Sequence, residues 1–149
     1  MPGIKFALAA LSSALSAHAL KVGVISDLHM NSYYSATASE DTNCVASNDK
    51  DFETVSNDTA PIGRINCDPS PVLVDYMLQR FTEAFGDVDV ILVTGDHVAH
   101  GVSPHHGQGS PEAWAKLKDN LDQSAQLLQK HFPSKIVLTN FGNNDGYHS

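Results

Sequence analysis

Three short apolar runs of the sequence are each followed by residues whose side chains bind metal ions. Asp27 and His29 come after the first run, Asp96 after the second and Asn143 after the third. Carboxylate oxygens and neutral imidazole nitrogens suit borderline divalent cations such as Zn²⁺ or Mn²⁺. Asp27 and His29 are spaced to reach one ion from a turning loop, and the two oxygens of Asp96 are able to bridge two ions. The pattern therefore indicates a site for two divalent ions, which we expect to be Zn²⁺, with Mn²⁺ as the alternative.

Such a pair of ions implies a particular reaction. Two metals about 3.5–4 Å apart hold a phosphoryl group, offset its charge and generate hydroxide for in-line attack. We therefore expect hydrolysis of a phosphoester without a covalent enzyme intermediate. Gly95, beside Asp96, lets the backbone approach closely. The alternative is that buried strands have simply ended and the polar residues face water in loops.

The apolar runs 21–26, 88–94 and 135–142 have the composition of buried strands. Two segments with helical spacing lie between them, and each begins with a serine cap and a proline at the first helical position, at Ser70-Pro71 and Ser110-Pro111. This order predicts an α/β fold with a parallel sheet whose middle run is covered by helices on both faces. In such sheets the functional site forms beyond the carboxyl ends of the strands, where the candidate ligands would meet.

The two predicted helices carry apolar residues that we assign to the core. In the first, which Gly86 ends, these are Val72, Leu73, Tyr76, Met77, Phe81 and Phe85. In the second, one stripe is formed by Trp114, Leu117, Leu121, Ala125 and Leu128. Phe141, after the third run, is likewise assigned to packing.

The N-terminal residues 1–19 have the pattern of a secretion signal. One basic residue, Lys5, precedes an apolar stretch, and Ala17-His18-Ala19 is the small-x-small pattern of a cleavage site. We expect removal after Ala19 and a secreted, lysosomal or vacuolar protein. A buried N-terminal helix is the alternative. The apolar stretch that follows Lys5 is shorter than the about 20 apolar residues that a membrane span needs. No later segment is long enough to span a bilayer either.

Residues 31–69 are rich in polar types, show no sustained period and predict a long irregular excursion. Cys44 and Cys67 lie in it, and an oxidising compartment favours their pairing, with two free thiols as the alternative. Asn57-Asp58-Thr59 is a glycosylation sequon that matters only if the chain is secreted.

The composition narrows the partners. The chain has 149 residues, enough for one modest domain, and a formal charge of −8 that is spread along it. An acidic surface of this kind argues against nucleic acid or an anionic membrane as partner. A phosphoester substrate would need a cation to bring it close.

Three ordered motifs resemble those of the calcineurin-like metallophosphoesterases. They are SDLH at 26–29, TGDHVAH at 94–100 and FGNND at 141–145, against the family blocks D-x-H, G-D and G-N-[HND]. NCDPSP at 66–71, an earlier cysteine and the histidine four residues after Asp96 are similar to the acid sphingomyelinase-like phosphodiesterase branch. The resemblance implies that residues 20–149 are the N-terminal portion of a metallophosphoesterase domain that acts on a phospholipid head group or a nucleotide-like phosphoester.

The resemblance also implies roles for single residues. Asp27 and His29 would bind the first metal, Asp96 would bridge, and Asn143 would bind the second. His100 matches the position that contacts the phosphate or helps protonate the leaving group, a task suited to histidine. Its alternative is a loop histidine hydrogen-bonded to backbone, and His97, His105 and His106 are not predicted to be ligands.

The sequence departs from the family pattern at two points. Asn144 stands where sphingomyelinases usually have histidine, and its amide is able to donate to a phosphate but not to protonate an alkoxide. The further histidine ligands of the family come from strands beyond the third block, so we expect a fragment whose sheet leaves an edge and apolar surface uncovered. A truncated, non-catalytic metal- or partner-binding protein is therefore the alternative function. Purple acid phosphatase is discounted because Ala99 replaces that family's tyrosine.

Overall fold

The computed structural model describes residues 19–45, 58–102 and 110–146. The predicted signal segment up to residue 18, Asn57 of the sequon, and the histidines at 105 and 106 lie outside these residues. Within the described ranges, no helix combines the length and the apolar character needed to cross a bilayer.

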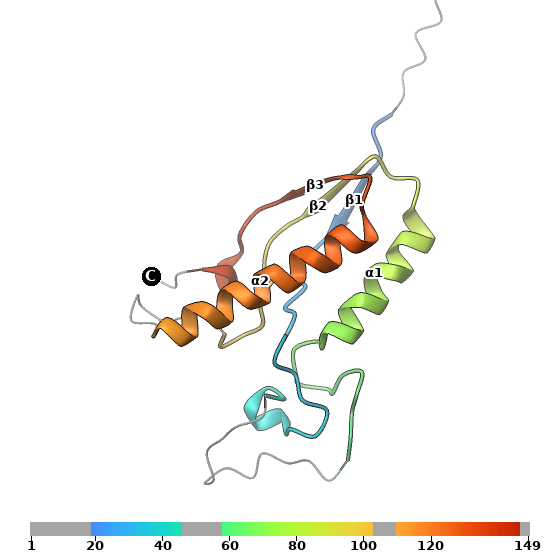
Figure 1. The fold of residues 1–149 in the computed structure, drawn as a ribbon. Helices are drawn as coiled ribbons and strands as arrows, with labels where there is room; N and C mark the ends of the chain where they lie inside the picture. Colours follow the sequence, from blue (N-terminus) through green and yellow to red (C-terminus); the bar gives the residue numbers. More distant parts are fainter. Residues whose placement is uncertain (1–18, 46–57, 103–109, 147–149) are drawn as a thin grey trace, which may run out of the picture.

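The described strands form one parallel sheet. β1 (Val22–Ile25), β2 (Val90–Val93) and β3 (Ile136–Thr139) lie in the order β1-β2-β3, with Val22 opposite Val90 and Val90 opposite Ile136. This arrangement confirms the predicted α/β fold with strands that point the same way. The carboxyl ends of all three strands therefore reach the same edge of the sheet (Figure 1).

Two helices connect the strands, and both begin where the sequence predicts. α1 (Pro71–Phe85) has Ser70 as its cap, whose hydroxyl accepts a hydrogen bond from the Leu73 amide. α2 (Pro111–His131) is capped in the same way by Ser110, which accepts from the Ala113 amide. In each helix the proline occupies the first turn, where a missing N–H costs nothing.

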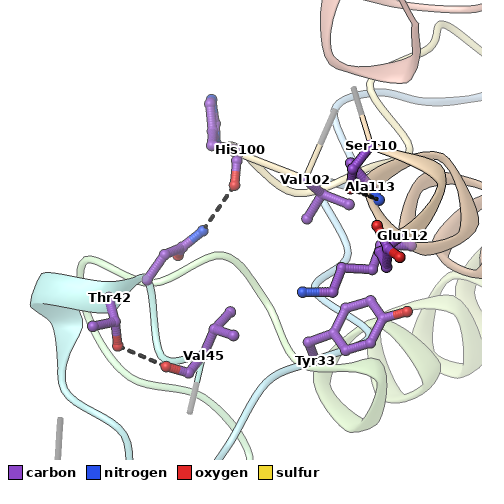
Figure 2. A pocket seen from close by; sticks show the side chains of 11 residues that line it. Tyr33, Thr42, Val45, His100, Val102, Ser110, Glu112 and Ala113 are labelled. Carbon is purple, nitrogen blue, oxygen red and sulfur yellow. Dashed lines mark hydrogen bonds between the residues drawn. The ribbon is translucent and has the colours of Figure 1, made fainter. Parts of the chain in front are cut away.

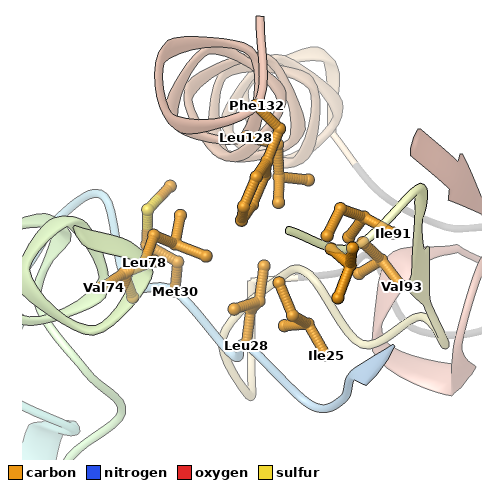
Figure 3. Close-up of a cluster of buried hydrophobic side chains, with 10 residues drawn as sticks. Ile25, Leu28, Met30, Val74, Leu78, Ile91, Val93, Leu128 and Phe132 are labelled. Atoms are coloured by element: carbon orange, nitrogen blue, oxygen red, sulfur yellow. The ribbon is translucent and has the colours of Figure 1, made fainter. Parts of the chain in front are cut away.

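The core lies between one face of the sheet and the two helices. Figure 3 shows Leu128 and Phe132 of α2 pointing towards residues of α1 and of the strands. The ring of Phe81 in α1 packs edge-on against Phe132 at 5.9 Å between centroids. The buried apolar residues of this cluster are Ile25, Leu28, Met30, Val74, Leu78, Val88, Ile91, Val93, Leu128 and Phe132.

The predicted core face of α1 is largely wrong. Val74 and Leu78 are the residues that α1 buries, whereas four residues assigned to the core are exposed, Val72, Tyr76, Met77 and Phe85. Apolar residues occupy more than one side of this helix, so spacing alone does not identify the side that meets the sheet. The packing assignment also fails for Trp114 and Phe141, which are 39% and 74% exposed.

The outer face of the sheet carries apolar residues that no described element covers. Successive strand residues alternate in direction, and those opposite the helices are exposed: Val22, Val24, Leu92, Ile136 and Leu138. The expectation that helices cover both faces of β2 is therefore wrong for the described residues, because α1 and α2 lie on the same side. The expectation of uncovered apolar surface agrees with this outer face.

Candidate metal centre

The loops that follow β1 and β2 run side by side and bring two of the sequence motifs together. The His29 amide donates to the Asp96 carbonyl at 2.8 Å, and the Met30 amide donates to the His97 carbonyl at 2.9 Å. The Ala99 amide returns a hydrogen bond to the Met30 carbonyl at 3.1 Å. The parallel pairing of the strands thus continues past their ends and fixes one loop against the other.

Three candidate ligands converge in this paired segment. His29 Nε2 lies 3.6 Å from Asp96 Oδ2 and 3.9 Å from Asp27 Oδ1. One possible ligand atom from each of the three residues lies within 4.8 Å of the other two. Asp96 is buried and Asp27 is exposed, so the cluster has one wall in the protein and one side open to solvent.

The same three residues have left-handed backbone conformations. The φ angles of Asp27, His29 and Asp96 are 54°, 41° and 50°. This conformation costs a residue with a side chain about 1–2 kcal/mol, and such strain collects at functional sites where the surrounding structure holds it in place. The conformation of the backbone is therefore a second reason, besides their distances, to treat these residues as a site.

The loop after β3 supports the site mainly through Asp145, which the sequence analysis did not single out. Asp145 Oδ1 accepts from the Val98 amide at 2.9 Å and Oδ2 accepts from the Gly142 amide at 2.8 Å. The Asn144 amide in turn donates to Asp96 Oδ1 at 2.9 Å. The signal available was the acidic last residue of the third motif, FGNND, to which the sequence pattern assigned no role.

Gly95 allows the second and third loops to touch. A Cβ at Gly95 would lie 2.8 Å from Gly142 Cα and 2.9 Å from the Phe141 carbonyl carbon, and its φ is +90°. A Cβ at Gly142 would collide with the Asp96 side chain. The expected close approach of the backbone beside Asp96 is therefore confirmed.

His100 lies against His29, and the two rings are stacked with centroids 4.4 Å apart and an interplanar angle of 13°. The His100 ring also contacts Asp68, whose Oδ1 is 3.0 Å from Nδ1. His29, Asp68 and His100 form a second cluster in which possible ligand atoms lie within 4.8 Å of one another. Asp68 belongs to the NCDPSP motif but was not predicted as a site residue.

The remaining candidates have different positions. Asn143 begins a short 3-10 helix (Asn143–Asp145) and is exposed, whereas Asn144 is buried. His97 is 6% exposed, with Nε2 2.7 Å from the Thr139 hydroxyl, and therefore packs in the interior.

A pocket of about 440 Å³ opens beside His100. Figure 2 shows Tyr33 and Val45 on one side of this pocket, and Val102 with the start of α2 on another. The Lys116 ammonium lies 5.4 Å above the Tyr33 ring in the same pocket. Of the residues in the two candidate clusters, His100 is the one that lines this pocket among the described residues.

The donor set fits divalent cations. Carboxylate oxygens from Asp27 and Asp96 surround an imidazole, which is the composition that Zn²⁺ and Mn²⁺ accept. His29 Nδ1 is buried with no hydrogen-bond partner among the described residues, while its Nε2 faces the carboxylates. Bringing charged groups so close is unfavourable unless a cation offsets them.

The model of the calcineurin-like phosphoesterase family matches residues 20–149, and the chain belongs to this family. Members typically bind two metal ions. Endopolyphosphatase of Schizosaccharomyces pombe is 28% identical over 138 residues, which cover 83% of this chain and 22% of that protein. Sphingomyelin phosphodiesterase A of Dictyostelium discoideum is 32% identical over 87 residues, 58% of this chain and 14% of that protein. The chain thus spans less than a quarter of the length of either relative.

Proposed function

We propose that this chain carries part of the metal centre of a metal-dependent phosphodiesterase. The observation that carries the proposal is the convergence of Asp27, His29 and Asp96 from two adjacent strand ends, with possible ligand atoms within 4.8 Å. The membership of a phosphoesterase family gives the reaction class. The more specific proposal, that the substrate is a phosphodiester, is supported by the similarity to sphingomyelin phosphodiesterase A.

In this proposal each residue has a separate task. Asp27 and His29 would hold one ion, Asp96 would contribute to holding both, and Asn143 would contribute to holding the second. Bound divalent ions offset the charge of the phosphate and activate water as the nucleophile. His100, whose side chain is 64% exposed beside this centre, donates a hydrogen bond or a proton to the departing oxygen. Asn144 follows in the same motif, and its side-chain amide is proposed to contact the phosphate.

The substrate is proposed to be a phosphoester with a substantial leaving group, such as a phospholipid head group or a nucleotide-like diester. The pocket that His100 helps to line supports this because it offers space for a bulky group on one side of that residue. Condensed phosphate is a second candidate, favoured by the similarity to endopolyphosphatase across most of the chain. We take zinc as the ion, with manganese as its competitor.

The location is also a proposal. A secreted, lysosomal or vacuolar protein fits the signal pattern at residues 1–19 and the pairing of Cys44 with Cys67, which the structure contains. Disulfides persist in such oxidising compartments. The alternative is a secreted homologue that binds metal without catalysis. The following experiment distinguishes it from a phosphodiesterase.

The test compares the wild-type chain with Asp96→Asn and, as a matched control, Asp122→Asn. Asn at position 96 keeps an oxygen for the Asn144 amide but removes the charge, whereas Asp122 pairs with Lys118 on the surface of α2. Since even residues behind the ligands change metal affinity by about 10–100-fold, Asp96→Asn should weaken zinc binding by more than that. Titration calorimetry measures the affinity.

Turnover is measured on bis-p-nitrophenyl phosphate, sphingomyelin and polyphosphate. Hydrolysis of the diesters that disappears in Asp96→Asn and persists in Asp122→Asn supports the phosphodiesterase. Cleavage of polyphosphate alone supports the second candidate. Zinc binding without turnover of any of the three points to the non-catalytic homologue, and equal zinc affinity in all chains refutes the metal centre.

A further inference from the structure

The disulfide joins two short segments that also hold each other by side chains. Cys44 and Cys67 are bonded with 5.8 Å between their Cα atoms. Their neighbours Asn43 and Asp68 exchange hydrogen bonds, because Asn43 Nδ2 donates to Asp68 Oδ2 at 2.7 Å and the Asp68 amide donates to Asn43 Oδ1 at 2.7 Å. We call these four residues the clamp. A covalent bond and two hydrogen bonds thus fix Asp68 in place.

Asp68 passes this fixed position on to His100. Its Oδ2 accepts from the His100 amide at 2.7 Å, and its Oδ1 lies 3.0 Å from His100 Nδ1. The Asp68 side chain is only 13% exposed, while that of His100 is 64% exposed. A mostly buried and cross-linked carboxylate therefore holds an imidazole that solvent reaches.

The contact selects one form of the neutral ring. A carboxylate beside Nδ1 stabilises the tautomer in which the ring proton is on Nδ1. In this tautomer Nε2 carries no proton. The stacked ring of His29 restricts the remaining rotation of His100. The neutral ring is therefore held in orientation and in tautomer before any substrate arrives, and its Nε2 has to take up a proton before His100 donates one to a departing oxygen.

The backbone of the clamp has an unfavourable conformation that the cross-link helps to maintain. Asn43 and Cys44 have φ angles of 50° and 55°. A non-glycine residue keeps such a conformation only while its surroundings impose it. Opening the disulfide would remove one of the restraints that hold Asn43 and Asp68 in this conformation.

We propose that Asp68 is a positioning residue for His100 and that the Cys44–Cys67 disulfide, through the clamp, keeps it in position. The catalytic meaning of this arrangement rests on the proposed function, but the arrangement itself is measurable without turnover. A rival reading makes Asp68 a metal ligand with His29 and His100. The hydrogen bonds disfavour it, because Oδ1 faces His100 Nδ1 and Oδ2 already accepts from Asn43 and from the His100 amide.

The experiment observes the His100 ring directly in the metal-free chain. Long-range proton–nitrogen NMR correlations at a pH of about 8.5, where imidazole is neutral, distinguish the two tautomers, and His100→Gln assigns the signals. The wild-type ring should carry its proton on Nδ1. Asp68→Asn and the double variant Cys44→Ser/Cys67→Ser should both shift the ring towards the Nε2–H form.

His97 is the internal control in the same spectra. Its ring is held by Thr139 and Ser124, away from the clamp, so its signals should not change in either variant. If the His97 signals do change, the variant has lost its general fold. Asn43→Ala, which breaks the clamp hydrogen bonds but leaves the disulfide intact, is then compared with the wild-type chain instead. An Nε2–H ring in the wild-type chain, or an Asp68→Asn ring identical to wild type, overturns the proposal.

Two further readouts separate this proposal from the proposed function. If the zinc-loaded chain turns over a diester, Asp68→Asn should lower kcat by about 10–100-fold with KM nearly unchanged, as residues behind catalytic groups do. If the chain is inactive but the tautomer depends on Asp68, the positioning stands and the catalytic function fails. Loss of a bound zinc ion in Asp68→Asn shows that Asp68 is a ligand and refutes the positioning role.

Discussion

The loops at the carboxyl ends of the strands differ from the outer face of the same sheet in how far their side chains have partners. At the strand ends, Asp145 accepts hydrogen bonds from the Val98 backbone amide of a neighbouring loop and from the Gly142 backbone amide of its own loop. Asp96 accepts one from the Asn144 backbone amide of a neighbouring loop. On the outer face, Leu92 and Leu138 are 36% and 55% exposed without a described element over them. The polar end of the sheet is held by contacts among the described residues, whereas its apolar face is not covered by them.

The two regions differ in which contacts determine their geometry. The loop after β1 bonds to the loop after β2, and the loop after β3 bonds to the loop after β2, so the positions of the candidate ligands depend on pairing the strands in the correct register. The outer face needs a cover of another kind, because contiguous exposed apolar surface marks a contact region. The described residues thus contain the contacts that specify the candidate metal centre, but they contain no cover for the outer face of the sheet.

The sharpest test of the comparison uses two neighbours on β2. Ile91 is fully buried on the helix side, and Leu92 points to the outer face. Ile91→Ala should lower the free energy of unfolding by about 2–5 kcal/mol, whereas Leu92→Ala should cost less than about 1 kcal/mol. Urea denaturation measures both. Equal losses would mean that the outer face is packed after all.

A second test perturbs the strand ends with a pair of glycines. Gly95 and Gly101 both have positive φ, but only at Gly95 would a Cβ meet neighbouring backbone. Gly101→Ala should therefore cost about 1–2 kcal/mol from conformation alone. Gly95→Ala should cost about 1–3 kcal/mol more from overpacking and should weaken zinc binding as it displaces Asp96. Stability curves for the two variants that superimpose would contradict the close approach.

The smallest effect is expected between the helices, away from both regions. Asp75 of α1 accepts hydrogen bonds from Lys130 Nζ at 2.7 and 2.8 Å and lies 2.6 Å from His131 Nε2. These contacts lower the pKa of the Asp75 carboxyl, the hydrogen bond from Lys130 having the larger effect and that from His131 the next. Because Asp75 is partly exposed, Asp75→Asn should cost only about 0.2–1 kcal/mol at neutral pH.

The pH dependence of this contribution has a definite sign. A carboxyl whose pKa is lower in the folded chain stabilises the fold above its ordinary pKa, and the contribution is lost as the pH falls through the folded-state pKa. The stability difference between wild type and Asp75→Asn should therefore vanish in acid. A difference that persists there would assign it to packing. Urea curves at a series of pH values measure this.

Much of the fold could be predicted because its signals are local. The Ser-Pro starts of α1 and α2, the apolar runs of the strands and the parallel order all follow from short sequence patterns. The convergence of Asp27, His29 and Asp96 follows in turn, since the ends of parallel strands meet at one edge. The pairing of Cys44 with Cys67 was predictable because two cysteines allow a single bridge.

The features that escaped prediction depend on contacts between distant segments. Asp68 and Asp145 are single acidic residues in polar stretches, and only the folded chain shows that they accept from His100 and Val98. The buried side of α1 escaped because apolar residues lie on several of its sides. The exposure of Phe141 escaped because an aromatic residue after a strand is more often packed.

The pairing of the strands also determines when the metal centre is able to form during synthesis. β1 leaves the ribosome first, yet its residue Val22 pairs with Val90 of β2, and nothing in between forms a strand with it among the described residues. A contact between segments so far apart must wait for the whole intervening chain. Asp27 and His29 therefore remain without Asp96 until α1 and β2 have emerged, and a chain released before that point contains the first motif but not its site.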